Sequence, residues 1–328
     1  MTLILSDKDV RGLADMPTLV DALEHGLREE ATGPGAILPE RMNLALGLTL
    51  FRVMPAILPA SGVLGLKFFY GTLSEGVRYS VMVSAIDGGE VLAVVDAAYL
   101  TALRTGATSG VATRYLASPD ARTVGLIGSG MEAETNLAAV CAVRPIETVR
   151  VYSRNPARRS DFARRMSARF GIAIEPVDTP EQAVAGTDVV VVATNTGRGG
   201  DVAFRGEWLT AGQHVVSIGS TATFLREIDE NTFLRPEVVV FDAAPAQVGA
   251  ESGDVVALIA EHPGWEPHGI LDDVLAGRLA RTDPGQITLF KSVGTAAQDL
   301  IGALALYRSA SARGVGLVVP ELAEPKAF

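Results

Sequence analysis

The stretch Thr123-Val-Gly-Leu-Ile-Gly128-Ser-Gly130-Met-Glu-Ala133 decides the fold of this chain. Its apolar first half is typical of a buried strand, and residues 132–143 are compatible with a helix. Gly128 permits a sharp turn, Gly130 keeps side chains away from a pyrophosphate, and Ala133 lets the helix pack closely on the strand. Free N–H groups at the start of the helix would bind phosphates, so the pattern predicts a dinucleotide site. The candidate cofactor-binding residues of this loop are Gly128, Ser129, Gly130, Met131, Glu132 and Ala133.

The rest of the pattern after Thr123 supports this interpretation. The runs at 188–193, 214–219 and 237–242 are almost continuously apolar, which is typical of strands buried on both faces of a parallel sheet. Segments with helical patterns separate them, and Thr179-Pro-Glu-Gln182 has the form of a capping box. These features predict an α/β fold with a Rossmann-type, doubly wound parallel sheet domain.

The residues before this motif have a different pattern. Residues 16–30 carry apolar side chains at helical spacing, whereas 41–95 contain short β-like runs separated by turn signals such as Asp87-Gly88-Gly89. This alternation predicts an antiparallel meander. Residues 100–116 indicate another helix, and Ser118-Pro119-Asp120 indicates a domain boundary. We therefore expect an α+β domain ahead of the Rossmann domain.

The end of the second Rossmann strand bears on the choice of cofactor. An acidic residue there would bind the ribose hydroxyls of NAD, whereas a small polar residue followed by arginine accommodates the 2′-phosphate of NADP. Here Ser153 and Arg154 follow the strand, and Arg158 comes soon after. NADP(H) is therefore favoured, and NAD(H) stays possible if the arginines only line a surface helix. Thr194, Asn195 and Gly219 complete the candidate cofactor-binding set.

Composition excludes several other classes of function. The formal net charge of −10 argues against a nucleic-acid partner, which would need a concentrated basic surface. The single cysteine, Cys141, excludes an internal disulfide, and no Cys/His spacing suggests a metal site. No apolar run approaches the roughly 20 residues of a membrane span. Since the N-terminal stretch also lacks a basic segment, we expect no signal peptide and a cytoplasmic protein.

Three further stretches, together with the dinucleotide motif, carry a resemblance to a known family. They are Arg41 with Met54-Pro55 and Lys67; Leu100-Thr-Ala-Leu-Arg104-Thr-Gly-Ala107; and Phe290-Lys291-Ser-Val-Gly294-Thr-Ala-Ala-Gln298-Asp299. From about residue 5 to 318 the chain resembles the ornithine cyclodeaminase/μ-crystallin family. The resemblance implies a homodimer in which residues 1–118 and 292–328 form the substrate-binding and dimerisation domain. Residues 119–291 would be the inserted NAD(P)-binding Rossmann domain.

The resemblance also implies a substrate site. Members of this family include amino-acid cyclodeaminases, alanine dehydrogenases and reductases of ketimines and other α-imino acids, all of which use a nicotinamide cofactor. Arg41, Lys67 and Arg104 match the family's substrate-carboxylate residues, and arginine suits bidentate carboxylate binding. Lys67 and Arg104 are the candidate catalytic residues, with Lys67 as a proton-relay or electrostatic group. The alternatives are a salt bridge within the fold for Arg104 and an outward-facing strand position for Lys67.

One departure from the family pattern favours reduction over cyclisation. Alignment on Arg226-Glu227-Ile-Asp229 puts Thr221, a candidate substrate-binding residue, where ornithine cyclodeaminases carry an aspartate. A hydroxyl cannot act as a general base near neutral pH without a partner, and hydride transfer to a protonated imine needs no base. We therefore expect an NAD(P)H-dependent reductase of a small α-imino acid, or an amino-acid dehydrogenase in reverse. The alternatives are a cyclodeaminase that recycles bound NAD and a catalytically silent, NADPH-binding protein of the crystallin type.

Overall fold

The computed structural model describes residues 1–72, 75–320 and 322–326, and the chain divides into two compact units. Unit 1 comprises Met1–Arg104 and Thr295–Phe328, and unit 2 comprises Thr105–Gly294. Unit 2 is therefore inserted into unit 1 along the chain. The sequence pattern puts the first boundary near 118 and the family resemblance puts the second after 291, whereas the first division in the structure falls inside helix α3 (Ala98–Leu116). A boundary inside a helix leaves no breaker in the sequence to mark it.

Unit 1 is built on a sheet with the strand order β15-β1-β6-β5-β4-β3-β2. Its strands are β1 (Thr2–Leu5), β2 (Met42–Leu46), β3 (Thr49–Leu58), β4 (Val63–Thr72), β5 (Gly76–Ala85), β6 (Val91–Asp96) and β15 (Leu317–Val319). Strands β2 to β6 pair antiparallel in chain order, which confirms the predicted meander. Strand β1 extends the sheet by pairing parallel with β6 and antiparallel with β15.

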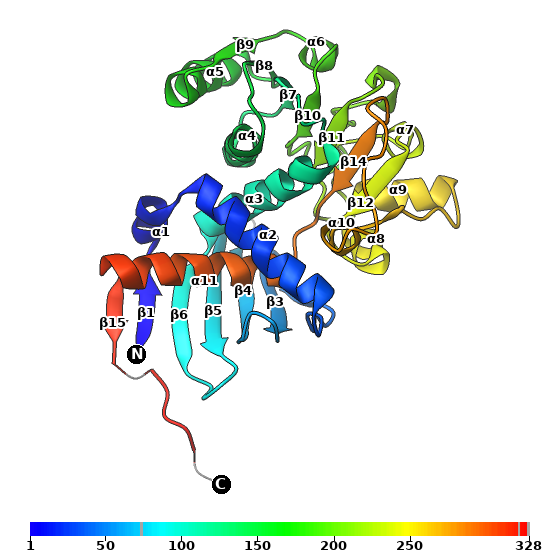
Figure 1. The fold of residues 1–328 in the computed structure, drawn as a ribbon. Helices are drawn as coiled ribbons and strands as arrows, with labels where there is room; N and C mark the ends of the chain where they lie inside the picture. The colour runs from blue at the N-terminus through cyan, green and yellow to red at the C-terminus, as the bar shows by residue number, and fades with distance from the viewer. Residues whose placement is uncertain (73–74, 321, 327–328) are drawn as a thin grey trace. The chain divides into compact units, whose positions relative to one another are not determined.

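One face of this sheet is covered by helix α11 (Ala296–Arg313), which contacts β3 to β6 and also packs against helix α2 (Met16–Thr32) (Figure 1). Helix α1 (Asp7–Leu13) contacts β1, β6 and α11. A capping box at Thr295 and Gln298 starts α11, and Gly314 ends it in the left-handed conformation. Because strand side chains alternate between faces, the buried side chain of Lys67 on β4 lies on the face that α11 covers.

Unit 2 is built on a parallel sheet with the order β13-β12-β14-β11-β10-β7-β8-β9. Its strands are β7 (Thr123–Ile127), β8 (Thr148–Tyr152), β9 (Ala173–Pro176), β10 (Val189–Val192), β11 (His214–Ser217), β12 (Val238–Phe241), β13 (Gly269–Ile270) and β14 (Thr288–Lys291). Strands β10, β11 and β12 are buried throughout, as their apolar runs predict, and β14 is buried throughout as well. The predicted α/β fold with a Rossmann-type parallel sheet is confirmed.

Helices connect these strands. They are α4 (Met131–Val143), α5 (Pro156–Phe170), α6 (Pro180–Val184), α7 (Asn231–Leu234), α8 (Pro245–Glu251), α9 (Gly253–Glu261) and α10 (Leu271–Leu275), with a 3₁₀ turn at Gly206–Trp208. The predicted capping box at Thr179 and Gln182 is present at the start of α6. In the part of the chain that the structure describes, no helix has both the length and the apolar character to span a membrane.

Strand order fixes where unit 2 can bind a ligand. From β7 the chain proceeds to β8 and β9 on one side of the sheet and then to β10 and β11 on the other. In open α/β sheets, ligands bind outside the carboxyl ends of the strands at such a reversal of strand order. The carboxyl ends of β7 and β10 therefore mark the candidate cofactor site.

Candidate functional site

The glycine-rich loop begins at Gly128, directly after β7. Gly128 has a φ of 126°, and its N–H donates to the Tyr152 carbonyl oxygen at 2.8 Å. A Cβ at this position would lie 2.2 Å from the carbonyl oxygen of Ala193. The ends of β7, β8 and β10 thus converge on a residue that has no room for a side chain, and only glycine readily adopts its backbone conformation.

Gly130 is the N-cap of α4, and a Cβ there would meet no atom within 4 Å. Since this cap has no side chain, it leaves the first N–H groups of the helix to other acceptors. Ala133 is fully buried beside Gly128, and the Ser129 hydroxyl donates to Ser153 Oγ at 2.9 Å. The space in front of the N-terminus of α4 is open, and the loop that precedes α4 is hydrogen-bonded to Ser153 after β8. This arrangement fits a pyrophosphate. The side chains of Met131 and Glu132 occupy the first turn of the same helix.

Two arginines after β8 are exposed. Arg154 donates to the carbonyl oxygen of Asn195 at 3.3 Å, and Arg158 lies in the first turn of α5. The neighbouring Arg159 is different because its side chain is buried and forms an ion pair with Asp178. Arg154 and Arg158 are therefore the two guanidinium groups here that could meet a ligand phosphate.

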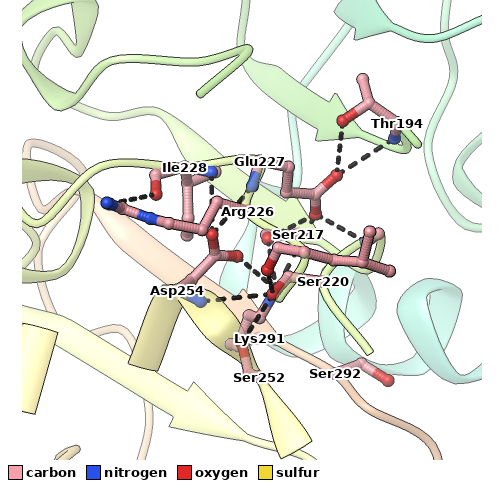
Figure 2. Close-up of polar contacts among 12 residues, drawn as sticks. Thr194, Ser217, Ser220, Arg226, Glu227, Ile228, Ser252, Asp254, Lys291 and Ser292 are labelled. Carbon is pink, nitrogen blue, oxygen red and sulfur yellow. Dashed lines mark hydrogen bonds and ion pairs between the residues drawn. The ribbon is translucent and has the colours of Figure 1, made fainter. Parts of the chain in front are cut away.

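The ends of β10 and β11 are joined by the carboxylate of Glu227 (Figure 2). Its Oε2 accepts hydrogen bonds from the N–H and the hydroxyl of Thr194, at 3.0 and 3.1 Å. Its Oε1 accepts from the Gly219 N–H at 2.6 Å and the Ser217 hydroxyl at 2.7 Å. Glu227 is only 1% exposed, and burial raises the pKa of its carboxyl group. Thr194 and Gly219 are both candidate cofactor-binding residues from the sequence. Glu227 holds them together, although in the sequence analysis Glu227 only anchors the alignment of Thr221.

Lys291, at the end of β14, lies beneath this carboxylate (Figure 2). Its Nζ donates to Asp254 Oδ2 and to Ser217 Oγ, both at 2.9 Å, and lies 3.8 Å from Glu227 Oε1. All of these side chains are buried. Sequence reasoning did not include Lys291 or Asp254 in the site, although a lysine that ends an apolar strand is a signal that could have found it.

Unit 1 contains a second cluster of buried charges. Lys67 Nζ lies 3.1 Å from Asp299 Oδ1, and Arg104 Nε lies 2.8 Å from the same oxygen. Arg104 Nη1 also donates to Gln298 Oε1 at 2.8 Å. Lys67 and Arg104 are 2% and 4% exposed, so Lys67 does not point outward. Arg104 does form a salt bridge within the fold, and it does so beside Lys67. Gln298 and Asp299 lie in a stretch that carries the family resemblance, but the sequence alone does not assign them to the site.

The electrostatics of this cluster favour an added anion. Burial lowers the pKa of Lys67 to about 8, with further lowering by Arg104 and Arg41 and an opposing effect from Asp299. Arg41 is partly exposed just before β2, and it is close enough to act on Lys67 electrostatically. Two buried cations share one Asp299 oxygen here, so a carboxylate that entered the cluster would be stabilised by the charge.

Thr221 lies in an exposed loop of unit 2, after β11. It therefore belongs to the same unit as the glycine-rich loop, whereas Arg41, Lys67 and Arg104 belong to unit 1. Within residues 1–72, 75–320 and 322–326, no group of three or more His, Cys, Asp or Glu side chains is arranged to hold a metal ion.

Comparison with known proteins identifies the family. The family model described as "Ornithine cyclodeaminase/mu-crystallin family" matches residues 1–314. The chain belongs to this family. The relatives described below match over nearly their whole length, so both units of the chain have counterparts in them.

Three similar proteins are a reductase from each of two organisms and a dehydrogenase. A Delta(1)-pyrroline-2-carboxylate reductase of Bacillus cereus is 31% identical over 325 residues, which cover 96% of this chain and 98% of the relative. A Thermococcus litoralis enzyme of the same name, solved with NADH and L-proline, is 34% identical with a TM-score of 0.89, covering 97% of this chain and 100% of that one. An archaeal alanine dehydrogenase dimer solved with NAD is 30% identical with a TM-score of 0.87, covering 96% and 98%.

Proposed function

We propose that this protein is an NAD(P)H-dependent reductase of a small α-imino acid. The observation that carries the proposal is the buried cluster of Lys67, Arg104 and Asp299, in which cationic side chains outnumber the carboxylate that they share. The reductase and dehydrogenase names of the relatives support the same chemistry. A bound nicotinamide cofactor would supply a hydride to the substrate Cα.

The residues of unit 1 would hold and polarise the substrate. Arg104 and Arg41 would bind its carboxylate through their guanidinium groups. Lys67, with a pKa of about 8, is mostly protonated at neutral pH and yet gives up a proton readily. It would attract the carboxylate as a cation and stand as a proton relay for the imine nitrogen.

Reduction is favoured over cyclodeamination by the side chain at position 221. A threonine hydroxyl in an exposed loop cannot act as a base near neutral pH without a partner. Reduction of an imine that is already protonated does not require such a base. We therefore assign Thr221 to substrate binding and not to proton abstraction.

For the cofactor we propose a preference for NADP(H) over NAD(H). The support is the exposed pair Arg154 and Arg158 at the end of β8, next to the small Ser153. A 2′-phosphate carries charge that these guanidinium groups would neutralise. The two solved relatives described above contain NADH and NAD, so the preference of this chain needs its own test.

We also propose that the protein is a homodimer that pairs through the open face of the unit 1 sheet. Directly opposite residues on β3 and β4 form an apolar surface on the face away from α11, with Leu44 of β2 continuing it. Leu44 is 53% exposed, and Phe51 and Tyr70 are 39% and 41% exposed. A contiguous apolar patch of this kind is typical of a protein interface. The members of this patch are Met42, Leu44, Phe51, Val53, Pro55, Ile57, Leu64, Leu66, Phe68 and Tyr70.

The experiment that tests the reductase proposal is oxidation of NADPH and NADH by the purified protein. The substrates are cyclic α-imino acids, and 2-oxo acids mixed with ammonia or methylamine. Turnover of at least one imine, lost in Arg104→Ala with cofactor affinity retained, is the expected result. Ammonia release from ornithine without net cofactor reduction would instead show a cyclodeaminase, and tight cofactor binding without turnover would show a silent binding protein.

A further inference from the structure

The segments that directly follow β10 and β11 approach closely in unit 2. A Cβ on Gly219 would lie 2.2 Å from the Thr194 carbonyl oxygen and 2.3 Å from Glu227 Oε2. The two segments therefore touch through backbone, with the Glu227 carboxylate inserted beside them (Figure 2). Both segments lie at the carboxyl edge of the parallel sheet, where a cofactor would bind.

Glu227 is itself held rigidly. Its N–H donates to Asp254 Oδ1 at 2.8 Å, and the Ile228 N–H donates to the same oxygen at 3.2 Å. The other oxygen of Asp254 accepts from Lys291 Nζ, which starts from the central strand β14. A continuous set of buried polar contacts thus connects the middle of the sheet to the two strand ends.

We infer that Glu227 is a positioning residue for the cofactor. The inference rests on the proposed function, because it assigns Glu227 to the same nicotinamide cofactor site. Glu227 fixes the backbone of Thr194 and Gly219 in the binding conformation before a cofactor arrives, so less ordering is needed on binding. It makes no direct contact with the cofactor in this role.

The chemistry explains why a carboxylate is required. Among the described residues, the groups that hydrogen-bond to the two Glu227 oxygens are all donors: the N–H and hydroxyl of Thr194, the N–H of Gly219 and the hydroxyl of Ser217, with the ammonium of Lys291 at 3.8 Å. An ionised carboxylate offers only acceptors. Glutamine in the same place would present an NH₂ group to one of these donors and would release one of the two strand ends.

The test compares Glu227→Gln with two controls. Glu230→Gln makes the same chemical change three residues away, where the carboxylate pairs with Arg226. Val248→Ala destabilises the core of unit 2 through a fully buried side chain that takes no part in the network. We measure the Kd for NADPH and NADH, hydrogen exchange at the amides of Thr194 and Gly219 without cofactor, and urea unfolding.

In Glu227→Gln we expect the Kd of the preferred cofactor to rise about tenfold or more, as expected for a lost hydrogen bond to a charged group. Exchange at the released amide should accelerate. Both controls should keep the wild-type Kd, even where Val248→Ala loses as much stability. An unchanged Kd in Glu227→Gln, or an equal rise in Val248→Ala at matched stability, would overturn the positioning role.

A measurement on the wild-type protein covers the case in which Glu227→Gln does not fold. Without cofactor, the amides of Thr194 and Gly219 should already be protected like those of β10 and β11. Free exchange that stops only when cofactor is added would overturn the inference. If the wild-type protein binds neither NADPH nor NADH, the proposed function fails, whereas the protection of these two amides is still measured independently.

Discussion

Lys67 on β4 and Asp299 on α11 are 232 residues apart in the chain, and their side chains meet at 3.1 Å inside unit 1. The insertion of unit 2 between Arg104 and Thr295 separates them in sequence, and the packing of α11 on the sheet rejoins them. Because the contact is buried, the attraction between the two charges is stronger than it would be in water. The activity and the stability of the protein should therefore change with pH as Lys67 loses its proton.

The first prediction concerns the pKa of Lys67, which is about 8 in the folded protein against an ordinary value of 10.5. The kcat/KM for imine reduction should fall above about pH 8, since the neutral amine neither attracts a carboxylate nor donates a proton. In Lys67→Arg this fall should disappear, because arginine stays charged. If the fall persists in Lys67→Arg at the same pH, the titrating proton belongs to another group or to the substrate.

The same group should affect stability with the opposite sign. Between pH 8 and 10.5 the unfolded chain keeps its Lys67 proton while the folded chain loses it. The unfolded state then binds more protons, so the contribution of this group to the free energy of unfolding rises with pH over that window. Urea titrations should therefore show that the free energy of unfolding of the wild type approaches that of Lys67→Met as the pH is raised from 8 towards 10.5.

The second prediction concerns Asp299, whose carboxylate raises the pKa of Lys67. In Asp299→Asn the pKa of Lys67 should drop further, and the alkaline fall in kcat/KM should move below about pH 8. The free energy of unfolding at pH 7 should fall by about 3–5 kcal/mol, because two buried cations lose their shared partner. The half-exposed Asp161, which pairs with Arg164 and Arg165, is the control, and Asp161→Asn should cost no more than about 1 kcal/mol. An unmoved pH profile would separate Asp299 from Lys67.

Local pattern predicted the regular elements well, and long-range packing explains what it did not predict. The alternation on β3 to β5 and the apolar runs of β10 to β12 are properties of each segment alone. Strands β1 and β15 are short, and each is stabilised by pairing with the other across nearly the whole chain. The division between the two units after Arg104 also has no local signal in the sequence, because α3 continues through it without a break.

The candidate site divides in the same way. The positive φ of Gly128 was predictable because a single short motif requires a tight turn there, and the same motif predicts open space at Gly130. Glu227 was not predictable as a partner of Thr194 and Gly219, since only the folded sheet brings the three together. Asp299 likewise lies within a recognised motif, yet its two cationic partners come from β4 and α3.

The third prediction concerns the cofactor preference. Arg154→Ala should weaken NADPH binding by about 1.5–3 kcal/mol and change NADH binding little, because only NADPH carries the 2′-phosphate. Isothermal titration with both cofactors measures the difference. Arg164, an exposed arginine of α5 that pairs with Asp161, provides the control, and Arg164→Ala should alter neither affinity. Equal losses for NADPH and NADH in Arg154→Ala would count against a 2′-phosphate contact.

The fourth prediction concerns the homodimer. Leu44→Lys places a charge on the open face of the unit 1 sheet and should convert the dimer to monomers in sedimentation velocity experiments. Leu234 in unit 2 is 41% exposed, and Leu234→Lys should leave the dimer intact. A monomeric wild-type protein, or a Leu44→Lys variant that sediments as a dimer, would contradict the assignment of this face.

The fifth prediction separates the two glycines of the cofactor loop. Gly128→Ala forces a strained φ of 126° and a Cβ 2.2 Å from a carbonyl oxygen, so the free energy of unfolding should fall by about 3 kcal/mol. Gly130→Ala meets no protein atom within 4 Å, so only the poorer N-cap should matter and stability should fall by no more than about 1 kcal/mol. The Gly130→Ala substitution should instead raise the Kd for NAD(P)H, because the new methyl group lies where the pyrophosphate would bind. Unchanged cofactor binding in a stable Gly130→Ala protein would mean that the space before α4 receives some other group.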